Sequence, residues 1–69
     1  MTLQPVNSSN IAAVGYDGAS QTLTIEFRSG GTYEFYDVPE AVHQGLTQSS
    51  SLGSYFQQEI RGRYRYVRL

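Results

Sequence analysis

The segment QTLTIEFRSGGTYEF, residues 21–35, contains two short runs in which apolar and polar side chains alternate. Every second residue from Leu23 to Phe27 is apolar, and Tyr33 and Phe35 repeat the pattern after two glycines. Strict alternation is typical of a β-strand with one buried face, because successive side chains point to opposite sides of the sheet. The segment therefore predicts two neighbouring strands joined by a turn.

The turn between the two runs predicts how the strands pair. If Phe27 lies opposite Tyr33, the apolar residues of both strands share one face and Ser29-Gly30-Gly31 form a three-residue loop. Loops of this length need a residue in the left-handed conformation near their end, and glycine adopts that conformation without strain. Turn chemistry and alternation agree, so we expect an antiparallel hairpin with this pairing.

The flanking segments complete a small α+β domain. A strand expected over residues 10–16 precedes an Asp-Gly turn, so that three strands form an antiparallel meander. Apolar residues at a spacing of four predict a helix over residues 39–47, and a second helix that begins at the serines 49–51 and ends near Gly62. Two short helices covering one face would bury the apolar side of the sheet. The expected core consists of Leu23, Ile25, Phe27, Phe35, Val42, Leu46, Phe56 and Ile60.

The two ends of the chain have different patterns. Residues 1–9 are polar and show no period, so we expect a flexible N-terminal lead-in before a single domain over residues 10–69. Residues 64–68 alternate once more, and this pattern fits either a fourth short edge strand or an extended tail. A chain of 69 residues leaves room for one domain only.

Composition excludes several classes of function. The chain has no cysteine and a single histidine, His43, so we expect no disulfide framework, no metal site and no cofactor. No apolar run approaches the roughly 18–20 residues that span a bilayer, and we expect a soluble cytoplasmic domain without a small-molecule substrate. The carboxylates are scattered singly, and a hydrolytic triad needs serine, histidine and acid in contact. We therefore interpret the chain as non-enzymatic.

The charges are divided unevenly along the chain. Residues 1–60 hold one arginine and all six acids, a net charge of −5, whereas residues 61–69 hold four arginines, a net charge of +4. Lysine is absent. Such asymmetry indicates a charged interaction segment at the C-terminus, although the arginines could equally pair with the acids of the same molecule, such as Glu26, Glu34 or Glu59.

The C-terminal arginines alternate with tyrosines, and this pattern favours binding of nucleic acid, above all single-stranded RNA. Arginine neutralises phosphates and tyrosine offers a flat face for unpaired bases. If four arginines each contact a phosphate, the logarithm of the affinity should fall with that of the salt concentration with a slope of about −3. We expect the double variant Arg63→Ala, Arg65→Ala to weaken RNA retention without changing the melting temperature. The candidate binding residues are Arg61, Arg63, Tyr64, Arg65, Tyr66 and Arg68.

An alternative hypothesis is a protein-docking module in which the C-terminal segment is structural. The docking surface would then be the uncovered face of the sheet, which is expected to show Thr24, Glu26 and Tyr36. Tyrosine and arginine also anchor many protein interfaces. Salt separates the two hypotheses, because phosphate binding weakens at moderate salt and an apolar contact does not.

Several short segments, taken together, resemble one family: SSNI at 8–11, VGYD at 14–17, LTIEF at 23–27, GTYEF at 31–35, VP at 38–39, SLGSYF at 51–56 and IRGRY at 60–64. They are similar to the KTSC domain, which occurs as a small bacterial protein and at the C-terminus of some lysyl-tRNA synthetases. The resemblance implies a domain of unestablished function for which RNA binding has been suggested. The family's central Tyr-x-Tyr is Tyr33-Glu34-Phe35 here, and Leu52 and Ser54 stand where relatives often carry basic residues.

Overall fold

The central hairpin forms as the alternation predicts, but its strands pair differently. In this computed structural model, which describes residues 3–69, strand β3 (Thr22–Phe27) runs antiparallel to β4 (Thr32–Phe35). Ile25 lies opposite Tyr33, so the expected pairing of Phe27 with Tyr33 is wrong. Gly30 takes the left-handed conformation (φ 110°), and the Phe27 amide donates to the carbonyl oxygen of Gly31 at 2.8 Å. The observed register of the two strands differs from the expected one by two residues. Because side chains alternate with a period of two, each one keeps its expected face of the sheet.

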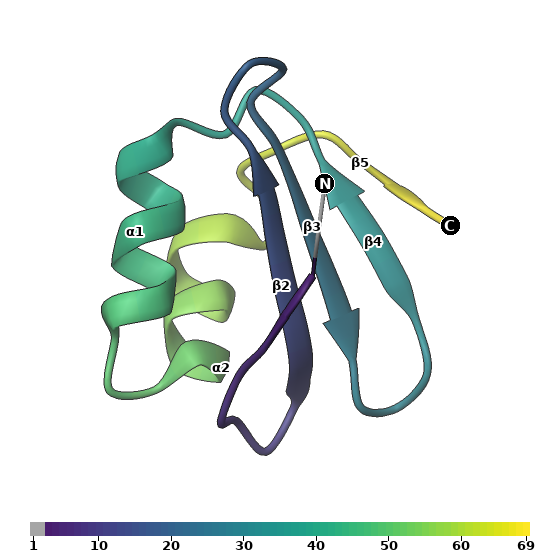
Figure 1. The fold of residues 1–69 in the computed structure, drawn as a ribbon, viewed down its shortest axis with the longest axis vertical. Coiled ribbons are helices and arrows are strands. Elements are labelled where there is room, and N and C mark those ends of the chain that lie inside the picture. Colours follow the sequence, from purple (N-terminus) through teal and green to yellow (C-terminus); the bar gives the residue numbers. More distant parts are fainter. Residues whose placement is uncertain (1–2) are drawn as a thin grey trace.

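The sheet contains five antiparallel strands in the described part of the chain, not three or four (Figure 1). Their order is β1-β2-β3-β4-β5, with β2 at Ile11–Asp17 and the C-terminal strand β5 at Tyr66–Arg68. Strand β5 pairs with β4, so the C-terminal segment forms an edge strand. This resolves the choice between strand and tail in favour of the strand.

Strand β1 (Gln4–Pro5) lies in the segment that the sequence assigns to a flexible lead-in. It pairs with β2, and the Val6 amide donates to the carbonyl oxygen of Ala12 at 3.1 Å. Without this pairing, the outer backbone groups of β2 would be an open sheet edge. The edge position falls to β1, where Pro5 is tolerated because an edge strand needs fewer backbone donors. Residues 1–2 of the expected lead-in lie outside the described residues.

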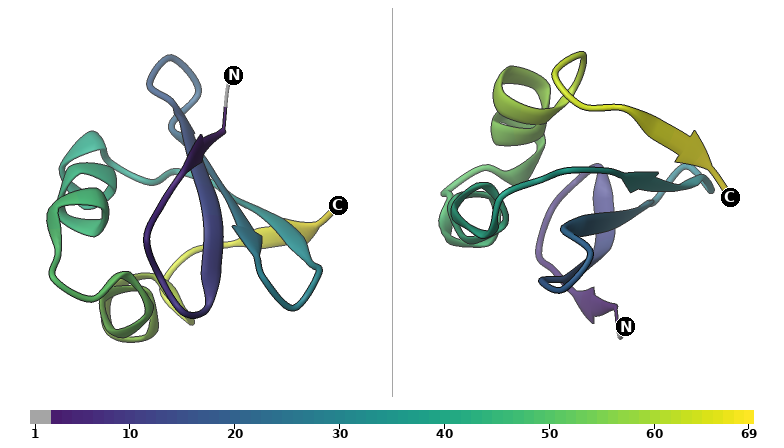
Figure 2. Two further views of the ribbon diagram at one scale, coloured as in Figure 1. Left: turned by 60° about the horizontal axis from the view of Figure 1, so that its bottom comes forward. Right: turned by 90° about the horizontal axis from the view of Figure 1, so that it is seen from above.

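The helices lie together on one side of the sheet (Figures 1 and 2). Helix α1 (Glu40–Gln48) lies one residue from its predicted limits at each end. Helix α2 (Leu52–Tyr55) continues into the π-helical turn η1 (Phe56–Ile60). Of the three serines, Ser51 caps α2, because its Oγ accepts from the backbone amide of Ser54 at 3.4 Å. Gly62 follows η1 with a positive φ of 79°, which fits the predicted helix end.

The core lies between the helices and the covered face of the sheet. Six of the eight expected core residues are buried, and the other two, Phe27 and Val42, are partly buried and pack against the core. Phe27 occupies the last position of β3, and its ring packs against those of Tyr33 and Phe56. Further buried core members are Ile11, Val14, Val38 and Leu52.

Gly45 allows α1 to lie close to Tyr55. A methyl group on Gly45 would lie 2.8 Å from Cζ of Tyr55 and still closer to its hydroxyl oxygen. Glycine inside a helix normally costs about 1 kcal/mol relative to alanine. Here we expect Gly45→Ala to lower the stability instead, because moving a half-buried ring costs about 1–3 kcal/mol. Urea unfolding followed by circular dichroism measures the change.

The matched control is Gly45→Ala combined with Tyr55→Ala. Once the ring is absent, the alanine should stabilise the protein relative to Tyr55→Ala alone, by up to about 1 kcal/mol. A higher unfolding midpoint for Gly45→Ala in the otherwise natural sequence would contradict the steric role of this glycine.

Candidate nucleic-acid interface

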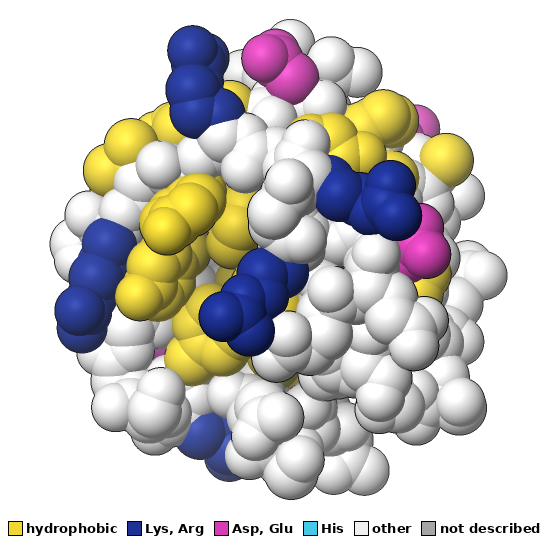
Figure 3. Space-filling view, turned by 180° about the vertical axis from the view of Figure 1, so that it is seen from behind, with side chains coloured by type: hydrophobic (Ala, Val, Ile, Leu, Met, Phe, Trp, Pro, Cys, Tyr) yellow, Lys and Arg dark blue, Asp and Glu magenta, His cyan; other side chains and the backbone are white. Residues whose placement is uncertain are grey.

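An open cleft of about 480 Å³ lies where the sheet extends past the helices, between η1 and the strands β4 and β5. We call it the aromatic cleft, because rings from four separate segments of the chain form its floor and walls. Figure 3 shows this side of the molecule, with hydrophobic side chains at the surface between arginine side chains. The lining residues are Phe27, Ser29, Gly31, Tyr33, Phe35, Phe56, Arg61, Gly62, Tyr66 and Arg68.

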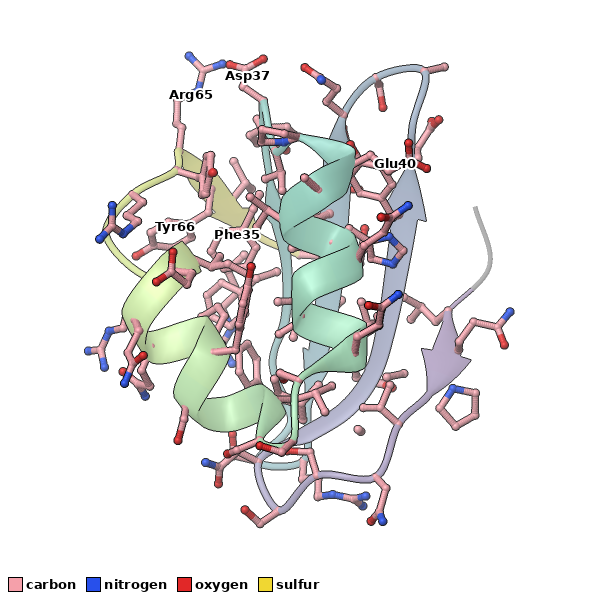
Figure 4. All side chains as sticks on the ribbon, turned by 90° about the vertical axis from the view of Figure 1, so that its left-hand side faces the viewer. Phe35, Asp37, Glu40, Arg65 and Tyr66 are labelled. Carbon is pink, nitrogen blue, oxygen red and sulfur yellow. The ribbon has the colours of Figure 1, made fainter. Side chains whose placement is uncertain are left out.

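The rings of the aromatic cleft form a continuous cluster. Phe35 is buried beside Phe56, with ring centroids 5.6 Å apart and nearly perpendicular planes. Tyr66 covers the outer side, 5.6 Å from the centroid of Phe35 and 5.7 Å from that of Tyr33 (Figure 4). Tyr66 remains 56% exposed. A fixed ring with an open side can stack an unpaired base.

Two arginines flank the aromatic cleft. Cζ of Arg68 lies 5.9 Å from the centroid of Tyr33, and Nη1 of Arg61 donates to Oε1 of Gln57 at 2.9 Å. Gly31 leaves room for the ring of Tyr33, because a Cβ there would lie 2.9 Å from a ring carbon of Tyr33, whereas 3.6 Å to Nε of Arg68 is an ordinary contact. Both arginines are exposed, and neither forms an ion pair with a carboxylate of residues 3–69.

The other C-terminal arginines point elsewhere. Arg65 lies 5.9 Å from the ring centroid of Tyr36 on the opposite face of the sheet, and it projects with Asp37 toward the end of the molecule (Figure 4). Nε of Arg63 donates to the backbone oxygen of Gln58 at 3.1 Å. Tyr64 packs partly buried against the core. The aromatic cleft therefore collects Arg61, Tyr66 and Arg68, but not Arg63, Tyr64 and Arg65.

The alternative in which these arginines pair with acids of the sheet is not found among residues 3–69. None of them forms an ion pair with a carboxylate in that part of the chain. Glu34 instead accepts a hydrogen bond from the hydroxyl of Tyr36 at 3.0 Å. This bond is the largest contribution that raises the pKa of the Tyr36 phenol, and the charge of Arg65 opposes it.

Sequence reasoning missed the part of the site that comes from the strands. The sequence predicts core positions for Phe27, Phe35 and Phe56 and a place on the apolar face of the hairpin for Tyr33. All four rings line the aromatic cleft. Alternation places such rings on the correct face, but it does not show where the helical cover ends. The uncovered face also differs from expectation, because Thr24 is only 5% exposed and offers little surface to a partner.

His43 belongs to a separate cluster on α1. Its ring stacks on Tyr16, with centroids 4.7 Å apart and planes 9° from parallel, and the Tyr16 hydroxyl donates to the carbonyl oxygen of Val38. Burial lowers the pKa of His43, and the nearby carboxylate of Glu40 opposes this shift. The stacked rings join α1 to strand β2.

Residues 3–69 contain neither a cluster of metal-ligating side chains nor a helix that could span a membrane. No three side chains among histidine, aspartate and glutamate come together as a metal site would require. The helices of this part of the chain are too short and too polar to cross a bilayer.

Comparison with known proteins identifies the family. The model of the KTSC domain matches residues 7–64. The chain belongs to the KTSC domain family. A KTSC domain protein from Yersinia pestis has a crystal structure that superposes with a TM-score of 0.97, at 38% identity over 99% of this chain and 96% of that one.

Relatives occur both as short proteins and as parts of longer ones. A protein of Tsukamurella paurometabola is 42% identical over 67 residues, which cover 97% of this chain and all of the relative. A lysine–tRNA ligase from a Nostoc species is 43% identical over 61 residues, which are 88% of this chain and 11% of the ligase. The similarity to the ligase is therefore confined to a small part of that enzyme.

Proposed function

We propose that this domain binds single-stranded RNA in the cytoplasm, with the aromatic cleft as its binding surface. The proposal rests on one observation: the exposed ring of Tyr66 and two arginines that form no ion pair within residues 3–69 line the same cleft. The similarity to a segment of lysine–tRNA ligases supports it, since the name of those enzymes gives tRNA as a substrate.

The chemistry of the aromatic cleft suits an unpaired strand. A base whose faces are not covered by its neighbours can stack on Tyr66, while Arg61 and Arg68 contact the phosphates on either side. A duplex hides its base faces and offers this cleft only phosphates. Because the whole chain carries a net charge of −1, attraction to nucleic acid should be confined to this surface and should be modest.

A chemical-shift titration with a six-nucleotide uridine oligomer tests the proposal. We expect perturbed amides at Gly31, Tyr33, Gly62, Tyr66 and Arg68. With two phosphate contacts, the logarithm of the affinity should fall with that of the salt concentration with a slope of about −1.4. Unchanged spectra at low salt, or shifts confined to the opposite face of the sheet, would refute RNA binding at the aromatic cleft.

The exposure of β5 supports a second candidate, protein docking at this edge of the sheet. Val67 and Leu69 are 49% and 67% exposed, and an edge strand can pair with an added strand. Apolar and main-chain contacts of this kind depend little on salt. Binding of a protein partner that persists at moderate salt, together with no chemical-shift change on adding RNA, would favour docking over nucleic-acid binding.

A further inference from the structure

The loop before β2 and the start of α2 lie at the same end of the molecule (Figure 1). Their side chains line a second hollow, of about 470 Å³. We call it the polar pocket. It is formed by residues 7–10 and 50–54 together with Gln57 and Gln58, and none of these lining residues carries a charge. Arg28 lies at its edge, where its Nε donates to the backbone oxygen of Ser8 at 2.6 Å. The lining side chains are almost all hydroxyls and amides. Such a lining can donate and accept hydrogen bonds but cannot neutralise an anion.

The walls of the polar pocket are held in place by local contacts. Oγ of Ser8 accepts from the backbone amides of Asn10 and Ile11, at 3.3 Å each, which leaves its hydroxyl proton free to donate. The side-chain amide of Asn10 reaches across to α2, where a Cβ on Gly53 would lie 3.2 Å from its Nδ2. The two walls therefore present neutral donors and acceptors toward one space.

The polar pocket adjoins the aromatic cleft through one hydrogen bond. Gln57 lines the polar pocket and accepts from Arg61, which lines the aromatic cleft. Gln57 lies in η1, and Arg61 is the extended residue that caps the end of this turn, so the bond joins the helix to the segment that follows it. A strand with a phosphate at Arg61 would therefore bring the sugar of an adjacent nucleotide toward Gln57.

We propose that the polar pocket binds this ribose and recognises its 2′-hydroxyl, so that the domain prefers RNA to DNA. The inference rests on the proposed function of the aromatic cleft and adds to it the identity of the sugar. A 2′-hydroxyl both donates and accepts hydrogen bonds, and it is the group that distinguishes RNA from DNA at a given position. Uncharged hydroxyls and amides are its natural partners.

Fluorescence anisotropy with six-nucleotide oligomers of uridine and of deoxyuridine tests the inference, because the two probes differ only in the 2′-hydroxyl. We expect the natural protein to bind the ribose oligomer about tenfold more tightly, the effect of one or two added hydrogen bonds. The double variant Asn10→Ala, Ser54→Ala should lose this preference and bind deoxyuridine as before. The control Ser20→Ala, in the exposed hairpin loop at the opposite end of the molecule, should retain it.

The outcomes separate the two levels of the proposal. Equal binding of both oligomers by the natural protein would overturn recognition of the ribose while leaving the aromatic cleft as a nucleic-acid site. Binding of neither oligomer at low salt would overturn the proposed function and the ribose site with it. A double variant that loses affinity for both oligomers, with an unchanged melting temperature, would show that the polar pocket acts on the strand without recognising the 2′-hydroxyl.

Discussion

Phe56→Ala is expected to unfold the domain. Phe56 is 8% exposed, and its ring lies 5.3 Å from the centroid of Phe27 and 5.6 Å from that of Phe35. Truncating such a ring costs about 3–5 kcal/mol, because the neighbouring groups cannot fill the cavity. A chain of 69 residues has a total stability of roughly 3–10 kcal/mol. The loss is therefore comparable to the entire free energy of folding.

The measurement is urea unfolding followed by far-ultraviolet circular dichroism at 25 °C. The matched control is Tyr66→Ala, a ring of the same aromatic cleft that contacts Phe35 but is 56% exposed. Tyr66→Ala should cost about 1 kcal/mol, the value of an exposed aromatic pair. Equal midpoints for the two variants would contradict the placement of Phe56 as the ring that joins η1 to the sheet.

The hairpin illustrates what local sequence can and cannot predict. Alternation over β3 and β4 fixes the face of each side chain, and the structure agrees with that part. The register depends on which of two adjacent glycines takes the left-handed conformation, and the pattern does not distinguish them. Gly30 does so, whereas Gly31 is buried beside Tyr33 and Arg68. A Cβ on Gly31 would lie 2.9 Å from a ring carbon of Tyr33, a contact that the alternation does not reveal.

The candidate site shows the same division. The uneven charge of the chain directs attention to the C-terminal arginines, and Arg61 and Arg68 indeed lie at the aromatic cleft. Strand β5 pairs with β4, and its alternation places Tyr66 and Arg68 on the face of the sheet that carries the aromatic cleft. Arg65 precedes this strand and lies on the opposite face. The polar pocket has no sequence signature, because the loop before β2 and the start of α2 are brought together only by the fold.

The arginine pairs provide the sharpest test of the aromatic cleft. We expect the variant Arg61→Ala, Arg68→Ala to weaken binding of single-stranded RNA about a hundredfold, since each lost phosphate contact costs about tenfold. The sequence alone predicts that Arg63→Ala, Arg65→Ala weakens RNA binding, but in the structure those side chains contact Gln58 and Tyr36 away from the aromatic cleft. This pair removes the same charge and therefore becomes the matched control. We expect it to weaken binding by less than about threefold, since only screened, longer-range attraction is lost. Anisotropy titrations at low salt measure both changes.

The salt dependence of the same variants separates contact from general attraction. Removing Arg61 and Arg68 should flatten the slope from about −1.4 to near zero, because each phosphate contact contributes about −0.7 on a single strand. The other pair should leave the slope unchanged. Both pairs lie on exposed positions, so neither should alter the melting temperature by more than a few degrees. If both double variants lost the same affinity for RNA, the C-terminal arginines would attract it only through their summed charge. The aromatic cleft would then have no special role in binding.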